Sequence, residues 1–170
     1  MARSIVLRQL TGSAKSRAQL ERKLADRNVP EDAATAVLDR YEDLGLVDDA
    51  EFARAWVRSR AGYRHLGRSA LRRELTLKGV HRDTIVDALD DLTDEQEYAG
   101  ALALVRRKLT AADRRQLTDP DADRQRLVRR LVSMLARKGY PPGTAFRAVN
   151  DVFAEAGADG PDPGEVSGTD

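Results

Sequence analysis

Residues 71–89 read LRRELTLKGVHRDTIVDAL, and this stretch carries the pattern that predicts the fold. Leu71 and Leu75 are four residues apart, so on a helix they lie on one apolar stripe. Lys78 follows three residues later, where a cation complements the negative end of the helix dipole. Gly79 tolerates the left-handed backbone conformation with which many helices end. The stretch therefore predicts a helix that stops at Gly79 and is followed by a second amphipathic helix.

The same order of apolar, basic and turn residues occurs three times in the chain, at separations of 51 and 60 residues. The equivalent residues are Leu20, Leu24, Arg27, Asn28, Val29, Val37 and Leu38 in the first copy, Leu71, Leu75, Lys78, Gly79, Val80, Ala88 and Leu89 in the second, and Leu131, Leu135, Lys138, Gly139, Tyr140, Ala148 and Val149 in the third. Each copy predicts a hairpin of two helices.

A further helix is predicted before the second and third hairpins. The stretches 48–57 and 93–102 are similar, and at a separation of 46 residues Phe52 aligns with Tyr98 and Trp56 with Leu102. The first hairpin is preceded only by a short apolar stub of Ile5, Val6, Leu7 and Leu10.

Three pairs of residues predict where helices begin. Thr93 with Gln96 fits the capping-box pattern, and Asp48 with Glu51 is a looser version. Ser16 with Gln19 provides a third start, at the first hairpin.

These signals predict an all-α fold of three tandem three-helix repeats with helix-turn-helix-like hairpins, which stack into an elongated curved protein. The predicted divisions are an N-terminal stub of the first repeat at 1–15, repeat 1 at 16–47, repeat 2 at 48–92, repeat 3 at 93–154, and a disordered acidic tail at 155–170. Residues 110–121 are expected to be a flexible hinge between the second and third repeats.

The composition excludes several classes of site. The 170 residues include no cysteine, which excludes disulfides, thiolate metal sites and cysteine nucleophiles. The N-terminal apolar run is too short for a signal peptide, and no apolar run approaches the roughly 20 residues that span a bilayer, so a cytoplasmic protein without membrane contact is expected. We find no catalytic constellation, and because His65 and His81 have no paired ligand, no metal site and no cofactor are expected.

Charge is unevenly distributed along the chain. The net charge is +1, but residues 155–170 contain five acidic residues and no basic one. The other 154 residues therefore contain 29 basic and 23 acidic residues, a net charge of +6. A basic body of this kind predicts weak, sequence-independent binding to single- and double-stranded DNA.

The central part of the chain resembles the RecX family of RecA modulators. The residues that carry the resemblance are Asp48-Asp49-Ala50-Glu51-Phe52-Ala53, Trp56-Val57-Arg58-Ser59-Arg60, Gly67, Leu71, Glu74-Leu75 and Lys78-Gly79-Val80. The third repeat adds residues 103–109 and 135–140, so that the resemblance extends over about residues 16–154. The N-terminal stub and the acidic tail depart from the family pattern.

The resemblance implies a monomeric, non-enzymatic regulator whose partner is the RecA recombinase filament. Such proteins bind in the filament groove, suppress ATP hydrolysis and strand exchange, and so modulate DNA repair and the SOS response. The candidate partner- and DNA-binding residues are the basic ones on the predicted helices, which repetition would place along one surface. They are Arg54, Arg58, Arg60, Arg64, Arg68, Arg72, Arg73, Lys78, Arg106, Arg107, Lys108, Arg126, Arg129, Arg130, Arg137 and Lys138.

Two alternative functions are compatible with the same helices. The hairpins also suit a helix-turn-helix DNA-binding regulator, although Asp83, Asp87, Asp90 and Asp91 on a second helix would face phosphates. A helical adaptor for another protein is the third interpretation. The Phe52 and Trp56 pair could stack on bases, but its helical spacing is more typical of a core.

Overall fold

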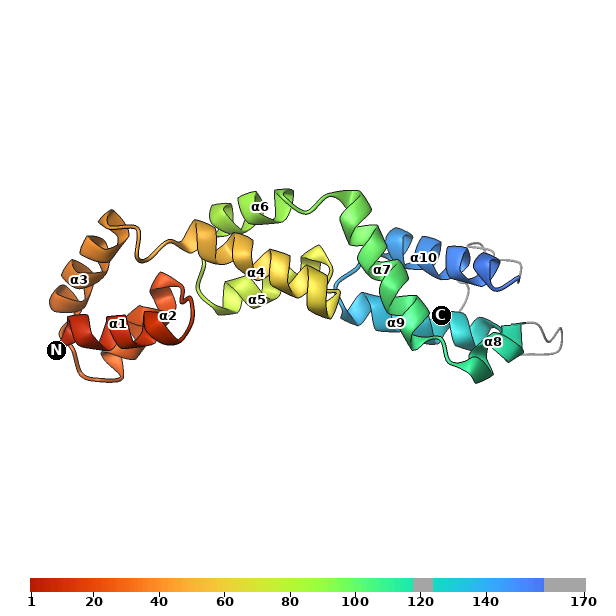
Figure 1. The fold of residues 1–170 in the computed structure, drawn as a ribbon, viewed down its shortest axis with the longest axis horizontal. Coiled ribbons are helices and arrows are strands. Elements are labelled where there is room, and N and C mark those ends of the chain that lie inside the picture. Colours follow the sequence, from red (N-terminus) through yellow and green to blue (C-terminus); the bar gives the residue numbers. More distant parts are fainter. Residues whose placement is uncertain (118–123, 158–170) are drawn as a thin grey trace, which may run out of the picture. The chain divides into compact units, whose positions relative to one another are not determined.

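The described residues, 1–117 and 124–157, form ten α-helices and no β-strand in this computed structural model (Figure 1). The helices are α1 (Ala2–Gly12), α2 (Arg17–Ala25), α3 (Glu31–Asp43), α4 (Asp49–Arg64), α5 (Arg68–Leu77), α6 (Arg82–Asp90), α7 (Asp94–Lys108), α8 (Ala111–Leu117), α9 (Arg124–Arg137) and α10 (Pro142–Glu155). The predicted all-α class is confirmed.

The chain divides into two compact units, which are described separately below. Unit 1 consists of Met1–Ser59 and Arg72–Asp91, and unit 2 consists of Arg60–Leu71 and Leu92–Asp170. Helices α4 and α5 each contribute residues to both units. The compact units therefore do not coincide with the sequence repeats.

The core of the N-terminal part of unit 1 is formed by α1, α2 and α3. Leu20 and Leu24 of α2 are both buried, as their four-residue spacing predicts, and they pack with Val6 of α1 and Leu38 of α3. Residues 2–12, where only an apolar stub was expected, form a complete leading helix of 11 residues. Val6 of the expected stub is buried in this core, and Ile5 and Leu10 pack against it.

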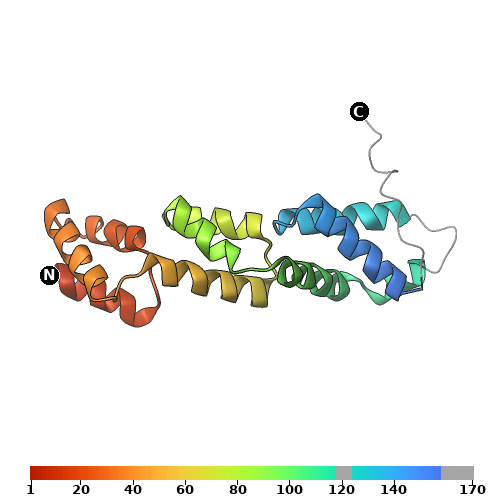
Figure 2. The same ribbon diagram turned by 90° about the horizontal axis from the view of Figure 1, so that it is seen from above.

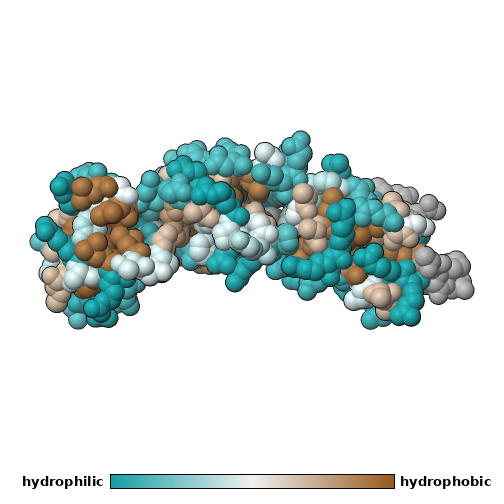
Figure 3. Space-filling model, viewed as in Figure 1, coloured by the Kyte–Doolittle hydropathy of each residue, from teal (hydrophilic) through white to brown (hydrophobic). Residues whose placement is uncertain are grey.

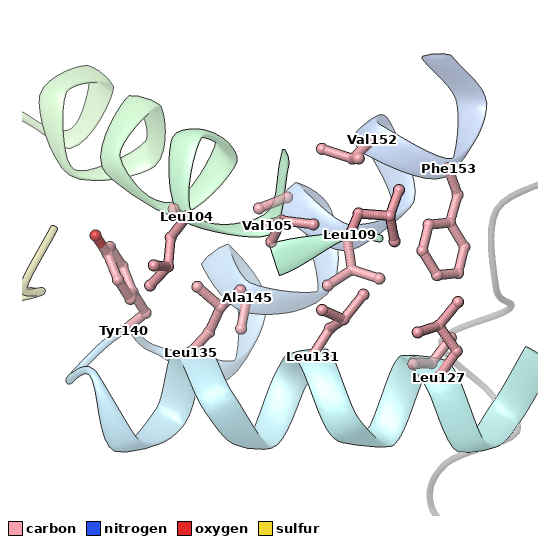
Figure 4. Close-up of a cluster of buried hydrophobic side chains, with 14 of the residues drawn as sticks. Leu104, Val105, Leu109, Leu127, Leu131, Leu135, Tyr140, Ala145, Val152 and Phe153 are labelled. Atoms are coloured by element: carbon pink, nitrogen blue, oxygen red, sulfur yellow. The ribbon is translucent and has the colours of Figure 1, made fainter. Parts of the chain in front are cut away.

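The core of unit 2 is formed by α7, α9 and α10, which lie side by side in Figures 1 and 2. Leu127, Leu131 and Leu135 follow one side of α9 at intervals of four residues and point toward the other two helices (Figure 4). Phe153 of α10 is fully buried against this row. Burying side chains of this size contributes about 1.5–3 kcal/mol each before entropy is subtracted.

The three hairpin turns have the same geometry. Asn28, Gly79 and Gly139 have φ values of 55°, 76° and 91°, so the predicted left-handed residues are confirmed. The amide of the residue after each of them donates to a carbonyl five residues back, with N–O distances of 3.1, 3.2 and 3.1 Å. This is the hydrogen-bond pattern of a Schellman cap, which satisfies carbonyls that a helix end would leave without a donor.

Three helix starts agree with the predicted capping residues. Reciprocal capping boxes join Ser16 with Gln19 and Thr93 with Gln96. At the looser pair the Glu51 amide donates to the Asp48 carboxylate, which is one of the two hydrogen bonds of a capping box. These caps place the first residues of α2, α4 and α7, on which the site geometry depends.

The segment expected to be a hinge contains α8. Asp113 accepts from both the amide and the hydroxyl of Thr110 at 2.8 Å, which caps the start of this short helix. The same carboxylate binds Arg130 of α9 at 2.7 Å. Residues 111–117 are therefore helical and tied to α9. Of the tail predicted at 155–170, Glu155 is the last residue of α10, and residues 118–123 and 158–170 lie outside the described residues.

Candidate partner and nucleic-acid interface

The same kind of contact, called a joint here, connects the start of one hairpin to the turn of another in both units. In unit 1 the Ser16 hydroxyl donates to the carbonyl of Lys78 at 2.6 Å, and in unit 2 the Gly67 amide donates to the carbonyl of Lys138 at 2.8 Å. The start of one hairpin thus caps the turn of the next, in both places. Because Lys78 and Lys138 take part through their backbone carbonyls, the joint depends little on the identity of their side chains.

A carboxylate belongs to each joint, and it is partly buried in unit 1 and buried in unit 2. The Arg17 amide donates to Asp49, and the Arg68 amide donates to Glu97, both at 2.8 Å. Ala53 and Ala101, four residues further on, are both buried in the joint-forming helices.

These contacts correct the sequence alignment of the leading helices. Asp49 corresponds to Glu97 and Trp56 to Leu104, so that the alignment of Phe52 with Tyr98 is wrong by two residues. The shared pattern of caps misled the alignment, because α7 begins one turn earlier than α4 relative to the joint.

Arg68 is a structural residue of the unit 2 joint. Its guanidinium binds Glu97 at 2.6 Å and Asp94 at 2.8 Å, and it also donates to the carbonyl of Leu92. The Glu97 side chain is only 4% exposed, so this pair is shielded from solvent on the carboxylate side. Arg68, one of the candidate binding residues, therefore has its guanidinium engaged in contacts within the chain.

Arg17 occupies the same place in the unit 1 joint, and it was not among the predicted binding residues. It binds Glu21, Asp39 and Glu42. Burial alone would lower the pKa of Arg17, but these carboxylates outweigh it and raise the pKa above the ordinary value. The signal that could have found Arg17 is its position immediately after the predicted capping residue Ser16, matching Arg68 after Gly67.

The other basic side chains of unit 1 differ in how free they are. Arg54 and Arg58 both bind Glu51, at 3.4 and 2.9 Å. Arg72 is exposed on α5 and, among the described residues, has no ion-pair partner. Arg73 next to it is exposed too, but has contacts of its own.

The Trp56 ring is held within unit 1. The Lys78 ammonium nitrogen lies 4.1 Å from the centroid of this ring, and the Phe52 ring stacks on it with centroids 5.9 Å apart. The Trp56 Nε1 donates to Glu74 at 2.8 Å. These contacts favour a structural role for Phe52 and Trp56 over base stacking.

Besides Arg68, two further candidate arginines of unit 2 are paired, and several candidate cations on α7 and at the end of α9 are not paired among the described residues. Arg106 binds Glu155, and Arg130 binds Asp113. Within the part of the chain that the structure describes, no carboxylate pairs with the following residues: Arg107, Lys108, Arg137 and Lys138.

The remaining candidates have other surroundings. Arg129 donates to Gln125 at 3.1 Å, and Arg60 and Arg126 also have contacts within the chain. Arg64 at the end of α4 is exposed, and no described carboxylate pairs with it.

Most of the candidate cations do not lie at positions that are basic in all three repeats, contrary to expectation. At a separation of 60 residues Arg72 and Arg73 correspond to Val132 and Ser133. Only one hairpin position is basic in all three copies, and it is occupied by Arg27, Lys78 and Lys138.

Two exposed side chains lie close to candidate cations and were not anticipated. Tyr63, next to Arg64 on α4, is 85% exposed, and Leu77, next to Lys78 on α5, is 77% exposed. Figure 3 shows mostly hydrophilic surface on both units, with hydrophobic patches on the face formed by the N-terminal helices. An exposed aromatic residue beside arginine is typical of contact residues in protein interfaces.

The described acidic residues limit the alternatives. Asp83, Asp87, Asp90 and Asp91 are all exposed on or directly after α6, so this helix would bring negative charge to a DNA groove. Within the described residues no group of three or more potential ligands could hold a metal ion. No described helix is both long enough and apolar enough to cross a membrane.

Sequence comparison places these features in a known family. Residues 2–40 match the family described as RecX, first three-helix domain, and residues 48–89 match RecX, second three-helix domain. The chain is 47% identical to the Regulatory protein RecX of Streptomyces coelicolor over 158 residues, which is 93% of this chain and 80% of the relative. It is 46% identical to the Regulatory protein RecX of Thermobifida fusca over 166 residues, covering 96% and 86%.

A solved structure supports the fold. The crystal structure of RecX from Lactobacillus salivarius superposes with a TM-score of 0.78 at 20% identity, covering 90% of this chain and 95% of that one. With ten helices in the described residues, two matched three-helix domains and relatives that are named as regulatory proteins, the chain belongs to the RecX family of regulatory proteins.

Proposed function

We propose that the chain binds the RecA recombinase filament on DNA and inhibits its ATP hydrolysis and strand exchange. We infer RecA as the partner from the resemblance of the chain to RecA modulators. The observation that carries the proposal is the set of exposed cations without carboxylate partners among the described residues, on α5 in unit 1 and on α7 and α9 in unit 2. Such cations are available to a polyanionic or acidic partner, whereas paired arginines are not.

Two separate basic patches on one chain would act together. When two patches are linked, binding of the first raises the effective concentration of the second, so that weak contacts sum to a stable complex. Loss of either patch should then remove much of the affinity. The regulator acts by stoichiometric binding, as a monomer, and with weak non-specific contacts to DNA.

The test reverses one unpaired cation in each unit. Arg72→Glu and Arg137→Glu leave every described ion pair intact, unlike a change at Arg130, which would break the contact with Asp113. Each should require several-fold more protein to inhibit DNA-dependent ATP hydrolysis by RecA. The matched control is Arg3→Glu, because Arg3 is exposed on α1 and also lacks a described partner.

Circular dichroism should first show that all three variants retain the helical spectrum of the parent. Equal inhibition by the parent and both test variants would refute the assignment of these surfaces. A parent protein that leaves RecA unaffected at several-fold excess over filament sites would refute the proposed function itself.

A further inference from the structure

Two turns of unit 2 lie against each other and bring distant residues together. The Gly67 amide donates to the Lys138 carbonyl at 2.8 Å, and the Tyr140 hydroxyl donates to the His65 carbonyl at 2.9 Å. A Cβ atom on Gly67 would lie 2.5 Å from the carbonyl oxygen of Gly139, so the two backbones are in direct contact. Residues 65–67 and 138–140 are thereby fixed side by side.

Helix α7 closes the third side of this arrangement. The Tyr140 hydroxyl lies 2.8 Å from where a Cβ atom on Gly100 would be, so α7 passes close to the hydroxyl end of the Tyr140 side chain. Leu104, one turn further along α7, lies beside Tyr140 in the core (Figure 4). Arg107 follows Leu104 by three residues, which places it on the same side of α7, at the end of the helix.

The two turns therefore hold residues 65 and 138 side by side, and Arg107, at the end of α7, lies near enough to act electrostatically on His65. Burial, followed by the positive charges of Arg107 and Lys138, lowers the pKa of His65. No acidic side chain of the described residues contributes to this shift, and Glu97, the buried carboxylate of the joint, is bound by Arg68. The charges that act on His65 are therefore both positive and give its surroundings a positive potential.

The flanking charges do not neutralise this potential. Arg64 precedes His65, Lys108 follows Arg107 and Arg137 precedes Lys138, so each of the three residues has a basic neighbour in the sequence. A compact anion with several acceptor oxygens is the ligand that such a group of donors would stabilise best.

We propose that His65, Arg107 and Lys138 form a binding site for one phosphodiester group of a single nucleic-acid strand. This inference rests on the proposed function, because it assigns the strand on which the filament is assembled to a particular place in unit 2. The two cations provide charge-assisted hydrogen bonds to the phosphate oxygens, and the imidazole provides a donor that becomes charged when the phosphate binds.

The first test measures the pKa of His65 by NMR, with and without a 15-nucleotide oligothymidylate. A phosphate beside His65 stabilises its protonated form, so its pKa should rise by about 1. His81 is exposed at the start of α6 in unit 1 and serves as an internal reference whose ring NMR signals should not respond to the oligothymidylate. An unchanged His65 pKa in the presence of bound oligothymidylate would overturn the assignment.

The second test compares two variants that lose the same charges. Arg107→Gln with Lys138→Gln removes the site, and Arg3→Gln with Lys15→Gln removes one arginine and one lysine without described partners from the N-terminal part of unit 1. Both should fold, because Lys138 contributes to the joint through its carbonyl. The salt dependence of oligothymidylate binding should fall by about 0.7 in log-log slope for the site variant, the amount for one phosphate contact.

The control variant should keep the slope of the parent protein. Equal slopes for parent and site variant would contradict the inference. A His65 pKa that rises with a 15-residue polyglutamate and not with oligothymidylate would also contradict it, since the site would then take acidic protein. Inhibition of RecA by the parent, measured in parallel, decides the proposed function independently of these results.

Discussion

Three residues with positive φ end the first helix of each hairpin, but only two of them need to be glycine. A Cβ atom on Gly79 would lie 2.4 Å from that of Ala18, and one on Gly139 would lie 2.3 Å from the Ala70 amide nitrogen. Asn28 has the same backbone conformation with its side chain exposed. The first helix of the preceding hairpin, α2 at Gly79 and α5 at Gly139, approaches the turn closely, so packing as well as backbone conformation excludes a side chain there.

Replacing Gly139 with alanine should destabilise the protein more than the conformation alone requires. Left-handed backbone costs an alanine about 1–2 kcal/mol, and the overlap with Ala70 adds about 1–3 kcal/mol. Gly45→Ala is the matched control, since Gly45 has φ 67° and a Cβ atom there would meet nothing within 4 Å. Urea unfolding should show that Gly139→Ala lowers the free energy of unfolding by at least about 1 kcal/mol more than Gly45→Ala, and equal losses would contradict the joint.

At the scale of the helices, Arg17 in unit 1 and Arg68 in unit 2 occupy the same position of the joint, but their ion pairs should differ in strength. The carboxylates bound by Arg17 are 41–60% exposed, whereas the Glu97 carboxylate bound by Arg68 is 4% exposed. Exposed pairs contribute little because water screens them, whereas a buried carboxylate that loses its partner is strongly destabilising. The unit 2 joint should therefore depend on its arginine more than the unit 1 joint does.

Alanine at these two equivalent positions measures that difference. Arg68→Ala should lower the free energy of unfolding by about 3 kcal/mol, because it leaves Glu97 buried without its cation. Arg17→Ala should cost about 1 kcal/mol or less. Urea or thermal unfolding provides the measurement, and a greater loss for Arg17→Ala would show that burial of the carboxylate does not decide the strength of the joint.

Helix α8 depends on a single ionised side chain. Burial raises the pKa of Asp113, but hydrogen bonds from Thr110 and the ion pair with Arg130 outweigh burial and hold the pKa below its ordinary value of 3.8. A carboxyl group whose pKa is lowered by folding stabilises the folded state above its ordinary pKa. That contribution is lost as the pH falls through the lowered pKa of the folded state.

The amides of α8 should therefore lose hydrogen-exchange protection as the pH falls below about 4. Asp113→Asn should show the same loss at pH 7 and little further change in acid, because it cannot ionise. The amides of α10 provide the reference within the same spectrum, since Asp113 caps α8 and binds α9 instead. Full protection of α8 in the Asp113→Asn variant at pH 7 would contradict the role given to this carboxylate.

Across the whole molecule, the charge of the C-terminal residues opposes that of the remainder. Glu155 belongs to α10 and is paired with Arg106, so the acidic residues beyond the described helices are Asp159, Asp162, Glu165 and Asp170. Four negative charges on the same chain compete with DNA phosphates for the basic surfaces, at a strength that falls with salt.

Truncation after Gly157 should tighten binding of single-stranded DNA several-fold at low salt, and the gain should shrink as salt is added. A full-length variant with Asn or Gln at the four acidic positions controls for chain length. Fluorescence anisotropy titrations at several salt concentrations would measure both. If truncation tightens binding and the neutralised full-length variant does not, length and not charge is responsible.

The helices, their caps and their turns could be predicted because each depends on residues within about five positions of one another. The leucine stripes of α2, α5 and α9, the capping boxes at Ser16 and Thr93 and the left-handed turns are of this kind. Helix α1 was expected only as a stub and the short α8 was missed, since both are stabilised by contacts with other helices: α1 packs on α2 and α3, and α8 is tied to α9 through Arg130.

An all-α member of this family with a basic body follows from the amino-acid sequence alone, whereas the packing of the helices selects which basic side chains remain available. Arg106 is neutralised by Glu155, 49 residues away, and Arg68 by Glu97, 29 residues away. The proximity of His65, Arg107 and Lys138 likewise joins residues that no local pattern connects. Charge is a property of composition, but its neutralisation depends on distances in space, and these exist only after the hairpins have packed.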